Sequence, residues 1–334
     1  MHPSDIATDV RRQAEAWGTH PALTELVEMF GGTIPPDLGF SARMAWMDEF
    51  SNVWDYRGRA RTDADRVDSQ DAAGAVRWLI PRLDLPAARL ARIESLTAEL
   101  GLTSEIAPAA TEFDYLLVIG GGRYTNRLRV GYARELAIGR RIGHVVLAAA
   151  SRSVMDSERD AVALCAPDAD TEFDLMVAAA DEAFGLDSHA ARRLQARCHT
   201  DSAPRGRRRW DFAPDSIDAG VPITLLEVPS PDPENRRANS ADTYTWAAQT
   251  VAMHGSGCLL VSGQPVGPYL HFEALRTLAL PFGIRVESAA FGVERYNRLG
   301  AKDEQHPAKI LQEVRSAIRS VRALAQVFDA GVTP

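Results

Sequence analysis

The run Tyr115–Ile119, which the triple glycine Gly120–Gly122 follows directly, limits the possible folds more than any other stretch of the chain. An unbroken apolar run without alternation is typical of a central strand that is covered on both faces, as in parallel sheets. Glycines after such a strand permit a sharp turn and let backbone amides come close to a ligand. The run therefore predicts an α/β protein with a ligand site at the turn that follows the strand Asp114–Ile119.

Strand and helix patterns alternate from Phe113 to about residue 290. The other predicted strands are short apolar runs: His144–Ala148, Ile223–Glu227, Cys258–Ser262 and Ile284–Ser288. The predicted helices carry apolar residues at three- and four-residue spacing: Leu128–Ile138, Glu172–Phe184, Ala241–Met253 and Tyr269–Leu278. This alternation predicts a Rossmann-like, mainly parallel sheet flanked by helices. The segment Leu186–Gly220 interrupts it, and we expect an insertion over the sheet.

The two ends of the chain have helical patterns only. Before Phe113 the predicted helices are Ile6–Trp17, Ala22–Phe30, Ala72–Ile80 and Ala87–Leu100. The aromatic rings of Phe40–Tyr56 are expected to fill a core or a domain contact, with a ligand cage as the alternative. The amphipathic stretch Pro307–Phe328 predicts a long helix that packs on the fold, with a homodimer contact as the alternative. We therefore expect a helical accessory domain (1–110), a Rossmann-like ligand-binding domain (111–294) and a C-terminal helix (295–334).

Composition excludes several classes of protein. The 334 residues are 46% hydrophobic, and their net charge of −8 argues against a nucleic-acid partner. The basic run Arg205–Arg209 is expected to be a solvated loop, with a lid over an anionic ligand as the alternative. No apolar run approaches the roughly 20 residues that span a membrane, and Met1–Asp5 does not resemble a secretory signal, so we expect a cytoplasmic protein. Three scattered cysteines without a C-x-x-C pair predict neither a disulfide framework nor a metal site.

The turn after the first strand is the strongest candidate for a binding site. Free amides at Gly120, Gly121 and Gly122 and at the N-terminus of the next helix favour an anion. Arg123 and Arg127 add guanidinium groups that can hold phosphate or carboxylate. The pattern is neither G-x-G-x-x-G nor a P-loop, so dinucleotide-dependent hydride transfer is not expected. The alternative is a plain tight turn.

Polar residues follow the next two strands as well. Ser151 and Arg152 come directly after the second strand, where ligands bind in open parallel sheets. Glu227 at the end of the third strand is a candidate for a contact with a ligand hydroxyl or for a general base, with a surface salt bridge as the alternative. Ser240 is expected to be a helix N-cap with Asp242 in the first turn, and we count both among the candidate ligand-binding residues.

The loop after the fourth strand supplies the last candidates. Gln264 and Tyr269 are expected to line the pocket. His271 titrates near neutrality in its ordinary state and is the candidate for proton transfer, with a structural role as the alternative.

At these residues the chain resembles the SanA/ElyC/YdcF-like family of bacterial domains. Three parts carry the likeness: Tyr115–Arg123, Glu227 with Arg237–Thr243, and Leu259–Ser262 with its polar turn. The resemblance covers residues 113–290 and implies a Rossmann-like fold whose loops converge on one pocket. It also implies a nucleotide-like or phosphorylated small molecule, or S-adenosylmethionine, as the ligand.

The leading hypothesis is an intracellular enzyme, a hydrolase or group transferase, that acts on a small anionic or nucleotide-like substrate. In it the glycine turn holds the anion, and Glu227 and His271 are catalytic. The alternative is a non-catalytic protein that binds a nucleotide or S-adenosylmethionine and regulates a partner.

Overall fold

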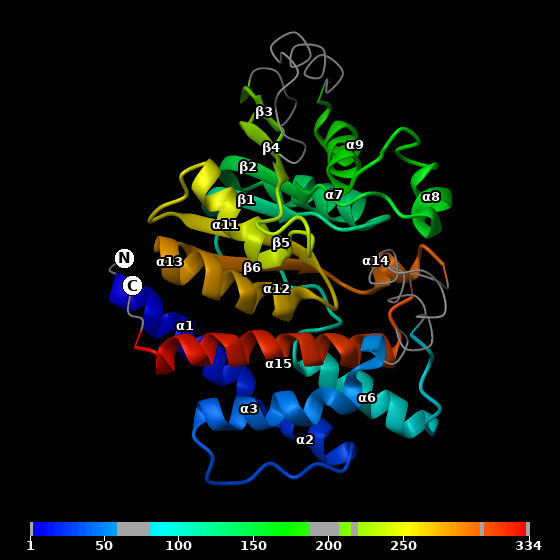
Figure 1. Cartoon of the computed structure of the whole chain (residues 1–334), viewed down its shortest axis with the longest axis vertical. Coiled ribbons are helices and arrows are strands. Elements are labelled where there is room, and N and C mark those ends of the chain that lie inside the picture. Colours follow the sequence, from blue (N-terminus) through cyan, green and yellow to red (C-terminus); the bar gives the residue numbers. More distant parts are fainter. Residues whose placement is uncertain (1–2, 59–79, 187–206, 215–219, 301–303, 332–334) are drawn as a thin grey trace. The chain divides into compact units, whose positions relative to one another are not determined.

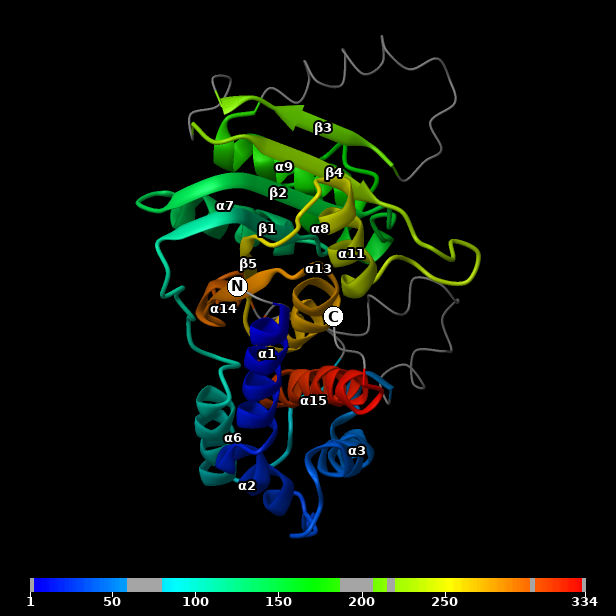
Figure 2. The same cartoon turned by 90° about the vertical axis from the view of Figure 1, so that its left-hand side faces the viewer.

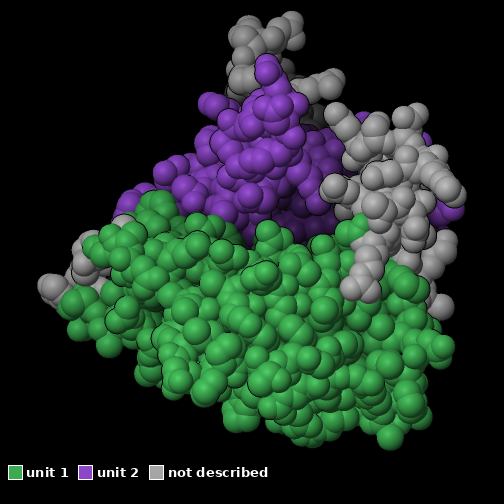
Figure 3. Space-filling model, turned by 60° about the horizontal axis from the view of Figure 1, so that its bottom comes forward, with its two compact units in different colours: residues 1–107, 263–283, 289–334 green, residues 108–262, 284–288 purple. Residues whose placement is uncertain are grey.

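The computed structural model describes residues 3–58, 80–186, 207–214, 220–300 and 304–331. The chain divides into two compact units, coloured separately in Figure 3. Unit 1 contains residues 1–107, 263–283 and 289–334, and unit 2 contains residues 108–262 and 284–288. The segment 263–283, which we assigned to the ligand-binding domain, thus groups with the helical ends of the chain.

A six-stranded sheet is the centre of the fold, in the order β3-β4-β2-β1-β5-β6 (Figure 1). The strands are β1 (Glu112–Ile119), β2 (Arg141–Ala150), β3 (Arg209–Phe212), β4 (Ile223–Val228), β5 (Gly257–Gly263) and β6 (Arg285–Phe291). Neighbours among β4, β2, β1 and β5 are parallel, whereas β3 is antiparallel to β4. The predicted α/β class with a mainly parallel sheet is confirmed.

The apolar run of β1 lies in the middle of this sheet. Leu117 pairs with Val146 of β2 on one side and with Leu260 of β5 on the other, and all three side chains are fully buried. A strand with partners on both edges and helices on both faces has no solvent-exposed side, which explains why its sequence does not alternate.

Helices cover both faces of the sheet in unit 2 (Figure 2). The helices α7 (Thr125–Ala137) and α9 (Glu172–Phe184) pack together on one face, and α11 (Ser240–Thr250) packs on the other. The short helix α8 (Asp156–Val162) lies in the connection from β2 to α9. These positions agree with the predicted helices to within a few residues at each end.

Unit 1 is built around α15 (Pro307–Asp329), the predicted amphipathic helix. Its apolar stripe, including Leu311, Val314 and Ile318, is fully buried. Around it pack α1 (Pro3–Gly18), α3 (Phe40–Phe50), α6 (Ala87–Glu99) and α12 (Gly267–Ala274), and α2 (Pro21–Met29) packs on α6. Trp54 of the aromatic stretch is fully buried, as expected of a ring that fills a core.

Three details differ from the sequence-based expectations. The insertion 186–220 contains the edge strand β3, which its polar composition concealed. The helix after β5 continues through a π-helical turn (Leu275–Ala279) into α13 (Leu280–Phe282), and the short helix α14 (Glu294–Asn297) follows β6. The predicted helix Ala72–Ile80 lies outside the described residues except for its last position. Within the described ranges, no helix is both long and apolar enough to cross a membrane.

The central strand gives a first prediction. Leu117→Ala should lower the free energy of unfolding by about 2–5 kcal/mol, because it leaves a cavity among residues that cannot collapse around it. Urea denaturation followed by circular dichroism measures the change. Ile138→Ala, at an exposed position of the same unit, should change stability by no more than about 0.5 kcal/mol. Equal losses in the two variants would contradict the buried position of β1.

Candidate functional site

The carboxyl ends of β1, β2 and β4 meet at one edge of the sheet in unit 2. The strand order reverses beside β1, because the chain adds β2 and β4 on one side of it and β5 on the other. Such a reversal is where open α/β sheets bind their ligands. Of the predicted site residues, unit 2 brings Gly120–Arg123, Ser151, Arg152 and Glu227 to this edge. Gln264, Tyr269 and His271 belong to unit 1.

Some backbone amides of the glycine turn already donate hydrogen bonds within the chain. The Gly120 amide donates to the Ala148 carbonyl at 2.7 Å, and the Gly121 amide donates to the buried Asn126 side chain at 2.8 Å. A Cβ at Gly122 would collide with the carboxylate of Glu158 and the guanidinium of Arg152, so a larger residue there would have to displace this ion pair. Two of the three amides that we predicted for an anion are therefore already hydrogen-bonded.

Arg123 ends the turn in an unusual backbone conformation. Its φ of 47° is in the left-handed region, which costs a residue with a Cβ about 1–2 kcal/mol. The guanidinium carbon lies 5.5 Å from the centroid of the Tyr124 ring. Strained residues of this kind cluster at ligand sites. Arg127, by contrast, forms an exposed ion pair with Glu182 of α9 at 2.7 Å.

Arg152 links the turn to the first turn of α9. Its guanidinium binds both carboxylate oxygens of Glu158, at 2.7 and 3.2 Å, and one oxygen of Glu172, at 3.0 Å. All three side chains are almost fully buried. Although burial opposes its charge, the two carboxylates raise the pKa of Arg152. Arg152 is therefore a fixed cation that is shared by two acids.

Arg208 makes a second cluster beside the first. It binds both carboxylate oxygens of Glu227, at 2.8 and 3.0 Å, and one oxygen of Asp174, at 2.8 Å. The guanidinium carbon lies 4.5 Å from the centroid of the Phe173 ring. The expectation of a solvated loop is therefore wrong for Arg208. Arg205 and Gly206 of the same basic run lie outside the described residues.

The setting of Glu227 determines its chemistry. Burial alone would raise the pKa of its carboxyl group, but the hydrogen bonds and the charge of Arg208 outweigh burial and lower the pKa. The pKa of Asp174 is lowered in the same way, by Thr171 and Arg208. A carboxylate with a lowered pKa is a weak base, and it stabilises the folded state at neutral pH in a way that acid removes. Glu227 is therefore better suited to accept hydrogen bonds than to remove protons.

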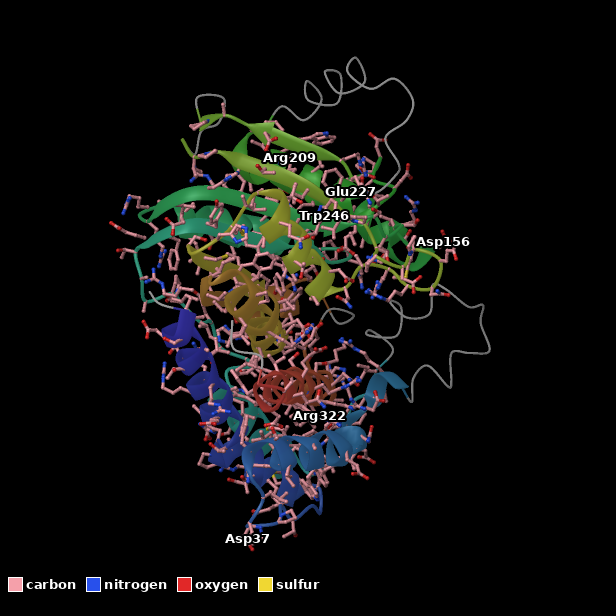
Figure 4. All side chains as sticks on the ribbon, turned by 60° about the vertical axis from the view of Figure 1, so that its left-hand side comes forward. Asp37, Asp156, Arg209, Glu227, Trp246 and Arg322 are labelled. Carbon is pink, nitrogen blue, oxygen red and sulfur yellow. The ribbon has the colours of Figure 1, made fainter. Side chains whose placement is uncertain are left out.

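We call these six side chains the strand-end network: Arg152, Glu158, Glu172, Asp174, Arg208 and Glu227. It contains four carboxylates and two guanidinium groups, so its formal charge is −2. The hydroxyl of Ser151 is buried next to Glu227, which it helps to keep ionised, but it makes no well-aligned hydrogen bond to a residue that the structure describes. Figure 4 labels Glu227 at this edge, with Asp156 at the start of α8. The network offers hydrogen-bond acceptors and an excess of negative charge.

The start of α11 has a structural explanation of its own. The N-cap is Asn239, not Ser240 as we expected, and it exchanges hydrogen bonds with Asp242 in a capping box. Asp242 also pairs with Arg236, which lowers the pKa of its carboxyl group against the opposing effect of burial. These contacts give Asn239 and Asp242 a structural role at the start of α11 that requires no ligand.

The three candidates of unit 1 lie among its helices. The amide of Gln264 is fully buried and donates to the carbonyls of Gly101, at 2.7 Å, and Ser104, at 3.3 Å. His271 of α12 is hydrogen-bonded through Nε2 to Gln13 of α1 at 2.8 Å. Burial lowers the pKa of His271 to about 4, so the ring is neutral at pH 7. Tyr269 lies on the same helix. These surroundings favour a structural role for His271.

Sequence reasoning missed four members of the network: Glu158, Glu172, Asp174 and Arg208. The acids of α9 could have been found from the sequence, because they occupy the first helical turn after a strand and its loop. Arg208 was noticed only as part of the basic run Arg205–Arg209, because its place at the edge of the sheet depends on the pairing of β3 with β4. Within the described ranges, no group of three or more histidine, cysteine or acidic side chains could hold a metal ion.

The network predicts that replacing Arg208 lowers the stability of unit 2 much more than replacing Arg127 does. Arg208→Met should destabilise unit 2 by about 2 kcal/mol, because it leaves two mostly buried carboxylates unpaired; we reduce the usual cost because the Arg208 side chain is 34% exposed. Arg127→Met, which breaks an exposed pair, should change stability by less than about 0.5 kcal/mol. Chemical denaturation measures the free energy of unfolding of both variants. An unchanged free energy of unfolding in Arg208→Met would argue against the network.

His271 gives a prediction about protonation. Proton NMR of its ring, assigned with the variant His271→Gln, should show no titration between pH 5.5 and 8, because its pKa is about 4. A midpoint near the ordinary histidine value would contradict the buried position and restore His271 as a candidate acid or base.

Comparison with known proteins identifies relatives over the whole chain. A family model described as "Rv3785 N-terminal domain" matches residues 2–101, close to the first segment of unit 1. The uncharacterized proteins Rv3785 of Mycobacterium tuberculosis and Mb3814 of Mycobacterium bovis are each 55% identical over 336 aligned positions, which cover 99% of this chain and 94% of theirs. No solved structure matches the chain. The protein therefore belongs to the family of mycobacterial Rv3785.

Proposed function

We propose that unit 2 binds a nucleoside-type small molecule at the strand-end network, and that S-adenosylmethionine is the member of this class whose charges fit best. The single observation that supports this proposal is the excess of carboxylates over guanidinium groups at the carboxyl ends of β2 and β4. Carboxylates accept hydrogen bonds from ribose hydroxyls and attract a sulfonium cation, whereas they repel a polyphosphate.

The glycine turn complements this set. S-adenosylmethionine also has one carboxylate, for which the turn offers the Gly122 amide and the side chain of Arg123. The strained backbone of Arg123 is the kind of feature that a ligand contact maintains. The resemblance to the SanA/ElyC/YdcF-like family points to the same class of ligand. We place the protein in the cytoplasm as part of this proposal, in agreement with the free thiols of Cys165 and Cys258.

Binding without acid–base catalysis is the form of the proposal that the contacts favour. Glu227 is engaged by Arg208, and the low pKa of His271 makes it a poor proton carrier at pH 7. A hydrolase that relies on these two groups is therefore less well supported. A group transferase is the second candidate, because methyl transfer depends mainly on positioning, and Glu227 is a strand-end carboxylate of the kind that orients a ribose.

Ligand titrations test the proposal. S-adenosylmethionine at a hundred times its Kd should stabilise the native state by about 2.7 kcal/mol, and ATP at the same concentration should have little effect. Arg123→Ala should weaken binding about tenfold, because a charged hydrogen bond to the carboxylate is lost. Arg127→Ala serves as the matched control and should bind as the wild type does.

Three results would distinguish the alternatives. Preferential binding of ATP would overturn the charge argument and restore the hypothesis of an anionic substrate. Binding that Arg123→Ala leaves unchanged would remove the glycine turn from the site. Formation of S-adenosylhomocysteine by the protein, alone or with added acceptor, would identify a transferase.

A further inference from the structure

An open depression of about 650 Å³, called the cavity below, lies on the surface of unit 1, and its lining comes from the 35–38 loop, the α3–η1 region and α15. This volume is typical of pockets for small ligands. Its walls differ in chemistry, because α15 contributes arginines while α3 and the loop contribute mainly apolar side chains. Figure 4 labels Arg322 on α15 beside α3, and Asp37 in the loop.

The arginine wall consists of Arg315, Arg319 and Arg322. Their spacing of four and three residues puts them on one face of α15, and the opposite face is buried in the core of unit 1. Arg315 is only 8% exposed, and within the described ranges it has one hydrogen bond, to Asn52 at 2.6 Å, and one longer ion pair, with Asp55 at 3.7 Å. A guanidinium has five donors, so a buried arginine with one bond leaves most of its capacity unused.

The other two arginines share one carboxylate. Arg322 pairs with Asp48, and Arg319 lies 3.7 Å from the same side chain without a hydrogen bond to any residue that the structure describes. Arg319 is largely exposed at the cavity. The wall thus has donors available for an additional acidic group.

The wall that faces the arginines determines the chemistry of the part of the ligand that is not acidic. Leu38 and Trp46 line it, and the Trp46 ring stacks on Phe50 with a centroid distance of 5.3 Å and an interplanar angle of 5°. This stacking holds a flat apolar surface in place. Asp48 and Glu49 line the cavity as well, and Asp55 lies 3.7 Å from Arg315, so three guanidinium groups are matched by three carboxylates. That balance accommodates one added negative charge better than several.

We propose that this cavity binds a small monoanion with an apolar ring or chain, in which the acidic group contacts the α15 arginines and the apolar part lies against Leu38 and Trp46. The site belongs to unit 1, uses no residue of the strand-end network, and does not depend on the function proposed for unit 2.

Fluorescence titration of the full chain with two probes of the same shape tests this proposal. 1-Anilinonaphthalene-8-sulfonate has a negative charge, and N-phenyl-1-naphthylamine has the same rings without it. The charged probe should bind more tightly. Arg319→Ala should weaken the charged probe about tenfold and leave the neutral probe unchanged, because it removes only the charged contact. Leu38→Ser should weaken both probes.

Arg12→Ala is the matched control, since Arg12 is an exposed arginine of α1 in the same unit, outside the cavity. It should bind both probes as the wild type does. The proposal is overturned if the charged probe does not bind, if Arg319→Ala and Arg12→Ala have equal affinity for it, or if Arg319→Ala weakens both probes alike. Circular dichroism of each variant separates a lost contact from a lost fold.

Discussion

The parallel pairing of β1 with β2 on one edge and β5 on the other is the constraint on which the rest of unit 2 depends. Because both edges and both faces of its second half are occupied, Leu116–Ile119 are apolar and buried, and the direction of the strand determines where the chain next reaches the surface. The connections that follow the parallel strands β1, β2, β4 and β5 therefore all begin at the same edge of the sheet. The polar residues of four separate segments meet there for this reason.

The charge of that edge narrows the choice of ligand more than its shape does. An arginine that is shared by two carboxylates is neutralised before any ligand arrives, and its strict geometry makes it a poor partner for a further anion. We predicted anion binding from the backbone amides of the glycine turn and from nearby arginines, whereas the folded chain has more acids than bases at this place. The cavity of unit 1 has no such excess of acids, because three guanidinium groups there meet three carboxylates, although it lies in a region that we expected to be structural.

The sequence was a better guide to the fold than to the site. Apolar runs such as Tyr115–Ile119 and the stripe of Pro307–Phe328 reflect burial directly, so strands and helices could be located from them. Ion pairs leave no such pattern: Arg208 and Glu227 are 19 residues apart, and only the antiparallel addition of β3 brings them together. The grouping of residues 263–283 with the helical ends depends on packing between distant parts of the chain, which cannot be predicted from the spacing of apolar residues.

The discontinuous course of unit 1 has a consequence for biosynthesis. Its N-terminal helices are made first, but α15, the helix around which they pack, is made last. Unit 2 is nearly complete in between, and domains generally form in the order in which they leave the ribosome. The helices α1, α3 and α6 therefore lack this packing partner, and the apolar surface that faces it stays uncovered, until more than 200 further residues have been translated. Chaperone capture of the nascent chain should be strongest during that interval.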